Sequence, residues 1–248
     1  RNSPECTEFG VSSVRRAYCL VRWANHLLRE RNLEITDVIL QFEVLLPHLV
    51  EILCKRNLGL PEPDVSKADH SIRIMRIQKL LLLVKECAEE MGVSWNPVEA
   101  SLIVAGNLEA ISDTLLVLAQ AFTLQPVEEG TDRASIALLK WCRRVLFGFA
   151  GALVTDFCSS WRSGLALCAL VHRLRPDVLD YTSRLSASPT ENVELALDMA
   201  AVYLDAPRLV EACDVVCEAP DHRAMALFLA GIWHRAAAAD AGGAGGWE

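Results

Sequence analysis

The chain has 248 residues, of which 52% are hydrophobic and 23% are charged, and its formal net charge is −8. This composition is that of a globular protein with room for one large domain or two of ordinary size, and it excludes a disordered chain. Residues 1–130 hold 13 Lys and Arg against 18 Asp and Glu, and residues 131–248 hold 11 against 14. Neither half has the positive charge of a general polyanion binder, so nucleic acid is not expected as a partner.

The apolar runs are too short for a membrane span, because runs such as residues 80–84 and 115–119 fall far below the required length of about 20 residues. The first ten residues, RNSPECTEFG, contain no basic-then-apolar signal segment. The nine cysteines are irregularly spaced, and five of them lie inside apolar runs: Cys19, Cys54, Cys87, Cys142 and Cys168. This pattern predicts reduced, buried thiols in a soluble, cytoplasmic protein.

The spacing of the apolar residues predicts an all-α protein, because helical periodicity dominates and alternating strand patterns are scarce. Proline- or glycine-containing breaks separate the helical stretches at residues 59–64, 92–97, 125–132, 174–177, 186–189, 205–207 and 218–221. Asp132 precedes one helical stretch and Ser188 or Thr190 precedes another, and these residue types are the ones expected at a helix N-cap.

Residues 14–31 are predicted to form the first helix. At 100° per residue, one broad face of this helix is apolar and consists of Ala17, Leu20, Val21, Ala24, Leu27 and Leu28. Arg15, Arg22 and Arg29 recur every seven residues on the opposite face, flanked by His26. A charged face of this kind can bind an acidic partner, but it can also be a solvated helix surface that binds nothing.

The two halves of the chain resemble each other. VRWANHLL (21–28) parallels LKWCRRVL (139–146), and IVAGNLEAISDTLLVLAQAF (103–122) parallels VVCEAPDHRAMALFLAGIWH (215–234). Two similar helical units joined by QPVEEGTD are therefore expected. The final AAAADAGGAGGWE indicates a helix that frays into a flexible tether, which suggests a larger parent protein beyond the C-terminus.

The second half carries one long and specific motif, DFCSSWRSGLALCALVHRLRPDVLDY, followed by ENVELALDMAAVYL. It resembles the second calponin-homology repeat of tandem actin-binding domains of the alpha-actinin, spectrin and filamin group. The matching positions are Asp156, Ser160, Trp161, Gly164, Leu165, Leu167, Cys168, Ala169, Leu170, His172, Arg175, Pro176 and Asp177.

The first half resembles the first repeat of the same family through LVRWANHLL, LPEPD and IVAGN. It diverges where the family has an Asp-Gly at the start of the central helix, since Val44 and Leu45 stand there with Pro47 following, and Ala105 replaces an Asp. The resemblance implies two calponin-homology helical bundles in tandem. The first is divergent and covers residues 11–125, residues 126–132 are the linker, residues 133–237 form the second repeat, and residues 238–248 are a flexible tail.

The resemblance further implies an F-actin-binding module of a cytoskeletal cross-linker or anchoring protein, located in the cytoplasm on the cytoskeleton. The implied actin contacts on the opening helix of the first repeat are Arg15, Tyr18, Arg22, His26 and Arg29. The opening helix of the second repeat is expected to add Lys140, Arg143 and Arg144. The alternative is an adaptor whose divergent first repeat binds a protein partner or microtubules instead of actin.

A phosphoinositide-responsive patch near Arg162, Arg173 and Arg175 is also implied, because some family members have one there. The family's Tyr-Arg loop is replaced by FGFAGAL in this sequence, which removes donors for a lipid headgroup. The alternative is that His172 and Arg175 are structural and bond carbonyls at the end of the central helix.

No catalytic motif is present, so neither an enzyme nor a cofactor is expected. Cys213, Cys217 and His222 have a spacing that zinc could use, but no fourth ligand is evident and buried thiols are the ordinary explanation. The remaining large aromatic residues are expected in the core, since they lie in helical apolar patterns: Trp23, Trp141, Trp161 and Trp233.

Overall fold

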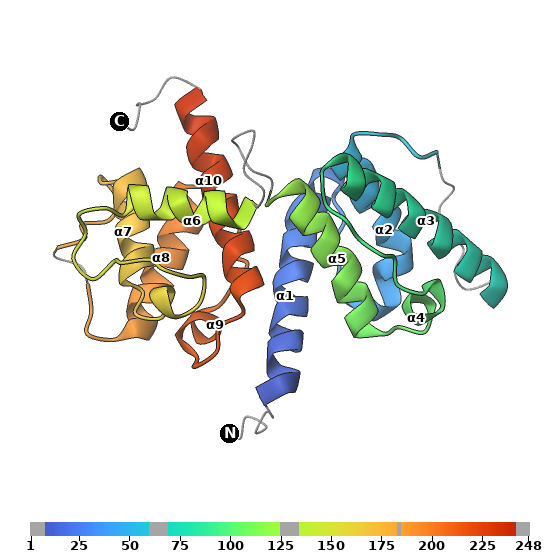
Figure 1. The fold of residues 1–248 in the computed structure, drawn as a ribbon, viewed down its shortest axis with the longest axis horizontal. Helices are drawn as coiled ribbons and strands as arrows, with labels where there is room; N and C mark the ends of the chain where they lie inside the picture. Colours follow the sequence, from blue (N-terminus) through green and yellow to red (C-terminus); the bar gives the residue numbers. More distant parts are fainter. Residues whose placement is uncertain (1–7, 60–68, 125–133, 183–184, 242–248) are drawn as a thin grey trace. The chain divides into compact units, whose positions relative to one another are not determined.

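The computed structural model describes residues 8–59, 69–124, 134–182 and 185–241. Every regular element in these ranges is a helix, so the prediction of an all-α protein is confirmed for the described residues (Figure 1). The chain divides into two compact units, which we call the N-terminal unit (Ala17–Gln125) and the C-terminal unit (Pro126–Glu248 together with Arg1–Arg16). The predicted linker lies outside the described residues.

The first helix differs from its prediction at both ends. Helix α1 spans Glu8–Leu28, and a 3-10 turn, η1 (Arg29–Arg31), follows it. The left-handed Asn32 and a hydrogen bond from Leu33 N to Leu28 O close this end of the helix. Arg29 therefore lies on the 3-10 turn that directly continues α1, and its direction differs by only about 20° from the one that a continuous α-helix would give it.

Among the described residues, the rest of the N-terminal unit forms three long helices and one short helix. These are α2 (Val38–Cys54), α3 (His70–Glu90), α4 (Ala100–Val104) and α5 (Leu108–Phe122). Helix α2 packs on α3 and α5, and α3 packs on α4 and α5. Asp37 caps α2 by accepting from Ile39 N and Leu40 N, and Asn107 caps α5 by accepting from Ala110 N.

Pro47 lies inside α2 rather than ending it. A proline in a helix interior removes one backbone hydrogen bond at a cost of about 3 kcal/mol. Helix α2 offsets this cost because its inward side chains are fully buried on both sides of the proline: Phe42, Leu46, Leu49 and Val50. The replacement of the family's Asp-Gly therefore leaves a continuous, largely apolar helix in the centre of the N-terminal unit.

Besides the start of α1, the described residues of the C-terminal unit form four long helices, one short helix and a 3-10 turn. They are α6 (Ala134–Val145), η2 (Ser159–Trp161), α7 (Leu165–Leu174), α8 (Pro189–Tyr203), α9 (Ala212–Val216) and α10 (His222–Ala241). Helix α7 packs against α6 and α8, α8 packs against α9, and α6 packs against α10. Ser188 Oγ accepts from Glu191 N and caps α8, so Ser188 is the cap and Thr190 is not.

The four tryptophans predicted for the core are all buried, which confirms that prediction. Trp161 is fully buried and donates its indole N–H to Asp156 O at 2.8 Å, and the rings of Trp141 and Trp233 stack at 5.9 Å. Helix α10 extends to Ala241 and so includes the first four residues of the predicted tail, while residues 242–248 lie outside the described residues. The run of alanines explains the extension, because alanine has the highest helix propensity.

Candidate functional site

Helix α1 is anchored by its apolar face. Ala17, Leu20, Ala24 and Leu28 are buried along it, as the 100° spacing predicted. Trp23 is also buried, and its indole N–H donates to Thr123 Oγ1 at 3.0 Å, which joins α1 to the end of α5. The rest of the helix circumference is therefore available to carry polar side chains.

The outer side of α1 within the N-terminal unit carries the predicted contact residues. Tyr18 is 64% exposed, and Arg29 is exposed on η1. Arg22 and His26 are half-exposed, and each has an interaction partner of its own. These four side chains form what we call the α1 outer surface: Tyr18, Arg22, His26 and Arg29.

Arg15 does not belong to the α1 outer surface, although the seven-residue spacing predicted it there. Within the C-terminal unit, Arg15 Nε lies 3.3 Å from Asp214 Oδ1. The neighbouring Arg16, which no pattern in the sequence singles out, donates from both Nε and Nη2 to Asp221 Oδ2 at 2.8 Å. Because these partners are about 200 residues away in sequence, no local pattern reveals them.

Asp221 is held in place from two sides. Its side chain is 4% exposed, and its Oδ1 accepts from Arg223 N and Ala224 N at the start of α10. Burial alone would raise the pKa of Asp221, but the hydrogen bonds from Arg16 and from Ala224 N hold it below its ordinary value. The carboxylate is therefore charged at neutral pH and acts as both a helix cap and an arginine partner.

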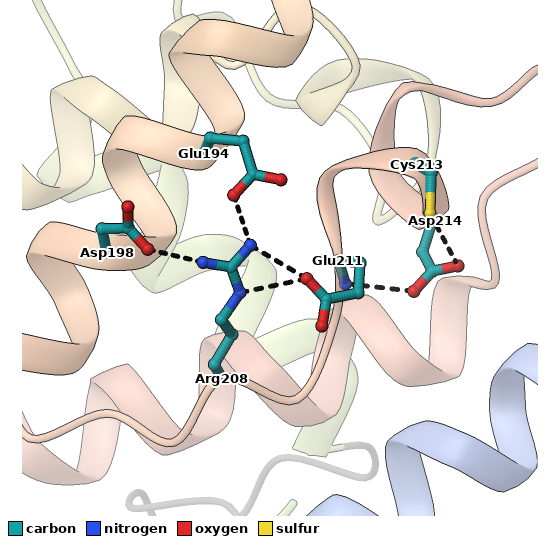
Figure 2. Close-up of polar contacts among 6 residues, drawn as sticks. All are labelled: Glu194, Asp198, Arg208, Glu211, Cys213 and Asp214. Atoms are coloured by element: carbon teal, nitrogen blue, oxygen red, sulfur yellow. Dashed lines mark hydrogen bonds and ion pairs between the residues drawn. The ribbon is translucent and has the colours of Figure 1, made fainter.

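Figure 2 shows a second arginine cluster in the C-terminal unit. Arg208, between α8 and α9, donates to the carboxylates of Glu194, Asp198 and Glu211. Partial burial opposes the charge of Arg208, but hydrogen bonds to Glu194 and Glu211 raise its pKa. Glu211 N in turn donates to Asp214 Oδ2 at 3.0 Å, so the carboxylate that meets Arg15 is positioned by the capping box of α9.

The three predicted contacts on α6 have different environments. Lys140 and Arg144 are exposed. Arg143 donates from Nε to Val154 O at 2.9 Å and from Nη2 to Thr155 O at 3.0 Å. Arg143 therefore holds the segment before η2, while Lys140 and Arg144 remain candidates for contact with a partner.

The predicted phosphoinositide residues are largely engaged by the protein itself. Arg173 donates to Val145 O and Phe147 O, at 3.0 and 3.1 Å. Arg175 binds Asp177 with two guanidinium nitrogens and donates to Tyr203 O at 3.1 Å. Arg162 is half-exposed. A lipid site here stays a prediction of the family resemblance, and it would have to compete with these bonds.

The structural alternative for His172 and Arg175 agrees with the geometry. His172 Nδ1 lies 2.5 Å from Leu179 O, and Arg175 reaches a backbone carbonyl of α8 as described above. Both side chains therefore tie the segment after α7 to its surroundings, as expected for residues that end a helix.

Within the part of the chain that the structure describes, no three His, Cys, Asp or Glu side chains lie close enough together to hold a metal ion. Cys213, Cys217 and His222 therefore do not form a zinc site in this structure. Among the same residues, no helix is both long and apolar enough to cross a membrane.

Comparison with known proteins assigns the C-terminal unit to a class. Residues 132–238 match the calponin homology (CH) domain family, and this range includes all of α6 to α10 except the last turn of α10. The chain therefore contains a calponin homology domain over these residues.

The similarity to individual proteins extends further. The chain is 31% identical over 223 residues to alpha-actinin-3 of Mus musculus and 32% identical over 217 residues to an alpha-actinin of Dermatophagoides farinae. These alignments cover 88% and 86% of this chain but only 24% of each relative, so the chain spans about a quarter of their length. The actin-crosslinking core of Schizosaccharomyces pombe fimbrin has a similar fold, with a TM-score of 0.68 and 15% identity over 88% of this chain and 49% of that one.

Proposed function

We propose that the chain consists of two calponin homology domains in tandem, the first over residues 11–125 and the second over residues 133–237, with residues 126–132 as linker. The alignment with alpha-actinin-3 supports this arrangement because it covers 88% of the chain, far more than the single matched domain. The N-terminal unit also has the helix content expected of such a domain, with the long helices α2, α3 and α5 following α1.

The function that we infer is F-actin binding, as a module of a cytoskeletal cross-linker or anchoring protein of the cytoplasm. The observation that carries this proposal is the identity of 31–32% with alpha-actinins over nearly the whole chain. We propose no enzymatic role, because a filament-binding module requires only a complementary surface. The relatives are about four times as long, so the remainder of a longer parent protein would supply the cross-linking or anchoring partner.

The α1 outer surface is the contact that we propose for the filament. It combines an exposed aromatic ring, Tyr18, with the cationic side chains of Arg22 and Arg29. Actin filaments carry acidic patches, and arginine is suited to bidentate binding of carboxylates. Lys140 and Arg144 on α6 are proposed as weaker additional contacts. Arg15 is not proposed as a contact, because its guanidinium faces Asp214.

Cosedimentation with actin filaments tests this function. The wild-type chain is expected to pellet with filaments, and less so as ionic strength rises, because exposed charges are screened by salt. The double variant Arg22→Glu/Arg29→Glu is expected to bind at least about tenfold more weakly. Lys79→Glu is the matched control, since it reverses an exposed charge on α3 of the same unit and should leave binding unchanged. Thermal midpoints verify that all variants are folded.

The alternative function is an adaptor that binds a protein partner or microtubules. The divergence of the first domain favours it, since the calponin homology match covers residues 132–238 only. An absence of wild-type pelleting with actin at high micromolar concentration, together with pelleting on microtubules, would replace the actin proposal by this one. If the double variant and Lys79→Glu lose the same amount of filament binding, the proposal of actin binding stands, but the α1 outer surface is not the specific contact.

A further inference from the structure

Two cysteines of the N-terminal unit meet where α2 and α3 end. Cys54 is the last residue of α2, and Cys87 lies one turn before the end of α3. Their Sγ atoms are 2.7 Å apart. Both are free thiols in the structure.

The surrounding structure keeps these two helix ends together. Arg56, just after α2, forms an ion pair with Glu90, the last residue of α3, at 3.2 Å. Cys87 is 1% exposed, so its side chain is fixed by packing, whereas Cys54 is half-buried and reachable from solvent. A disulfide bond needs an S–S distance of about 2.05 Å, so the sulfur atoms would have to approach by less than about 1 Å.

We propose that Cys54 and Cys87 form a reversible disulfide that joins α2 to α3, made by exchange with a small-molecule disulfide of the glutathione class. This inference does not depend on the proposed function, because it rests on contacts within the N-terminal unit alone. It assigns a covalent modification to a pair of thiols for which the family resemblance gives no role.

The exchange has two balanced steps. The Cys54 thiolate attacks oxidised glutathione, so that a Cys54–glutathione bond forms, the glutathione S–S bond breaks, and the released thiolate takes up the proton that Cys54 lost. Cys87 then attacks the Cys54 sulfur and releases a second reduced glutathione in the same way. Two protein thiols are oxidised to one disulfide, and one glutathione disulfide is reduced to two thiols.

The two cysteines have different roles in this sequence. Cys54 is the attacking residue because it is the accessible one, and Cys87 resolves the mixed disulfide because it is already in contact. Burial, the hydrogen bond with Cys87 and the charge of that neighbour raise the pKa of Cys54 to about 12. The first step is therefore slow at neutral pH and should accelerate about tenfold for each pH unit, because the thiolate is the nucleophile.

The test treats the full chain with oxidised glutathione at mildly alkaline pH and maps the unreduced peptides by mass spectrometry. The expected product is a peptide pair linked through Cys54 and Cys87. The thermal midpoint should rise by on the order of 10 °C, because a cross-link between residues that are 33 positions apart restricts the unfolded chain. Dithiothreitol should reverse both changes.

Two variants separate the roles of the cysteines. Cys87→Ser should retain glutathione on Cys54 and show no rise in the thermal midpoint, because the resolving thiol is missing. Cys54→Ser should leave Cys87 reduced. Cys213→Ser is the matched control, since it removes an exposed thiol in the other unit and should still form the bond. If Cys87→Ser does not fold, Cys54→Ser still tests the proposal, because without the attacking thiol Cys87 should stay reduced and the thermal midpoint should not rise.

Two results would overturn the proposal. The first is wild-type protein in which Cys54 keeps its glutathione although Cys87 is intact. The second is wild-type protein in which Cys54 and Cys87 both stay reduced after Cys213 has reacted fully. Neither result affects the proposed filament binding, which is measured on fully reduced protein.

Discussion

Arg16 and Asp221 form a bidentate contact in which both Nε and Nη2 of the arginine lie 2.8 Å from one carboxylate oxygen. The other oxygen of Asp221 accepts from Arg223 N and Ala224 N and so begins α10. One carboxylate therefore accepts hydrogen bonds from two backbone N–H groups at the N-terminus of a long helix. It also pairs with the charge of an arginine that is 205 residues away in the sequence. Within the C-terminal unit, this contact and the longer one between Arg15 and Asp214 hold the segment up to Arg16.

The two roles of Asp221 can be separated by substitution. Asp221→Asn keeps an oxygen that can cap α10 but removes the charge that Arg16 needs, and we expect a loss of about 2 kcal/mol in the free energy of unfolding. Asp221→Ala also removes the cap and should cost about 1 kcal/mol more. Urea denaturation measures both values. Equal destabilisation by the two variants would show that the cap contributes nothing.

The ion pair between Glu43 and Arg73 links α2 to α3, with the glutamate side chain buried and the arginine side chain half-buried. Glu43→Ala should lower the free energy of unfolding by about 3 kcal/mol, because it leaves a guanidinium without its carboxylate in a poorly hydrated site. The double variant Glu43→Leu/Arg73→Met should recover most of this loss, since apolar side chains of similar size need no partner. Denaturation of the two single variants and the double variant tests the coupling, and additive losses would contradict it.

Asp156 should contribute to stability against acid. Burial alone would raise its pKa, but hydrogen bonds from Ser159 Oγ, Cys158 N and Ser160 N lower it from 3.8 to about 2. A lowered folded-state pKa means that the stabilisation is present above pH 4 and is lost as the pH falls towards 2. Because the carboxylate is partly open to solvent, we expect the effect to be about 1 kcal/mol.

The comparison of wild type with Asp156→Asn isolates this contribution from that of other carboxylates. The wild type should be more stable than Asp156→Asn at pH 7, and this difference in stability should disappear between pH 4 and pH 2. Thermal unfolding at a series of pH values provides the measurement. If the difference in stability stays constant between pH 4 and pH 2, the charge of Asp156 does not contribute to stability.

Gly164 should tolerate no side chain. It begins α7 at φ +74, and a Cβ there would lie 2.6 Å from Asn192 Cβ and 2.8 Å from Val193 N. Gly164→Ala is expected to cost about 3 kcal/mol or more, since backbone strain and a clash with α8 add together. Gly148→Ala is the control, because Gly148 also has positive φ but would meet no atom within 4 Å, and it should cost about 1 kcal/mol. Equal costs in a denaturation experiment would argue against the close packing of α7 on α8.

Local features of the fold could be predicted because their causes lie close together in the chain. The periodic apolar face of α1 identified Ala17, Leu20, Ala24 and Leu28 as buried, although Val21 and Leu27 on the same face are only half-buried. Ser188 was among the two candidates for the cap of α8. Boundaries were less accurate. The start of α1 at Glu8 and the extension of α10 to Ala241 both depend on burial and propensity summed over many residues, which local sequence signals do not reveal.

The candidate site was predicted only in part. Tyr18 and Arg29 are exposed, as a contact surface requires. Arg15 and Arg143 were predicted as contacts because they are arginines on the opening helices, like Arg22 and Arg144. In the structure, however, Arg15 faces Asp214, and Arg143 donates to the backbone before η2. An arginine that is available and one that is engaged look alike in sequence, because the difference is set by groups brought in from elsewhere.

The sequence by itself determined that this protein is helical and that its second half resembles a calponin homology domain, because helix periodicity and the long motif around Trp161 are local properties. Only the tertiary structure decided that Arg15 and Arg16 are held by aspartates, and that Cys54 and Cys87 touch. Ion pairs and sulfur contacts act over a few ångströms in space, and folding alone decides which distant residues come within that range.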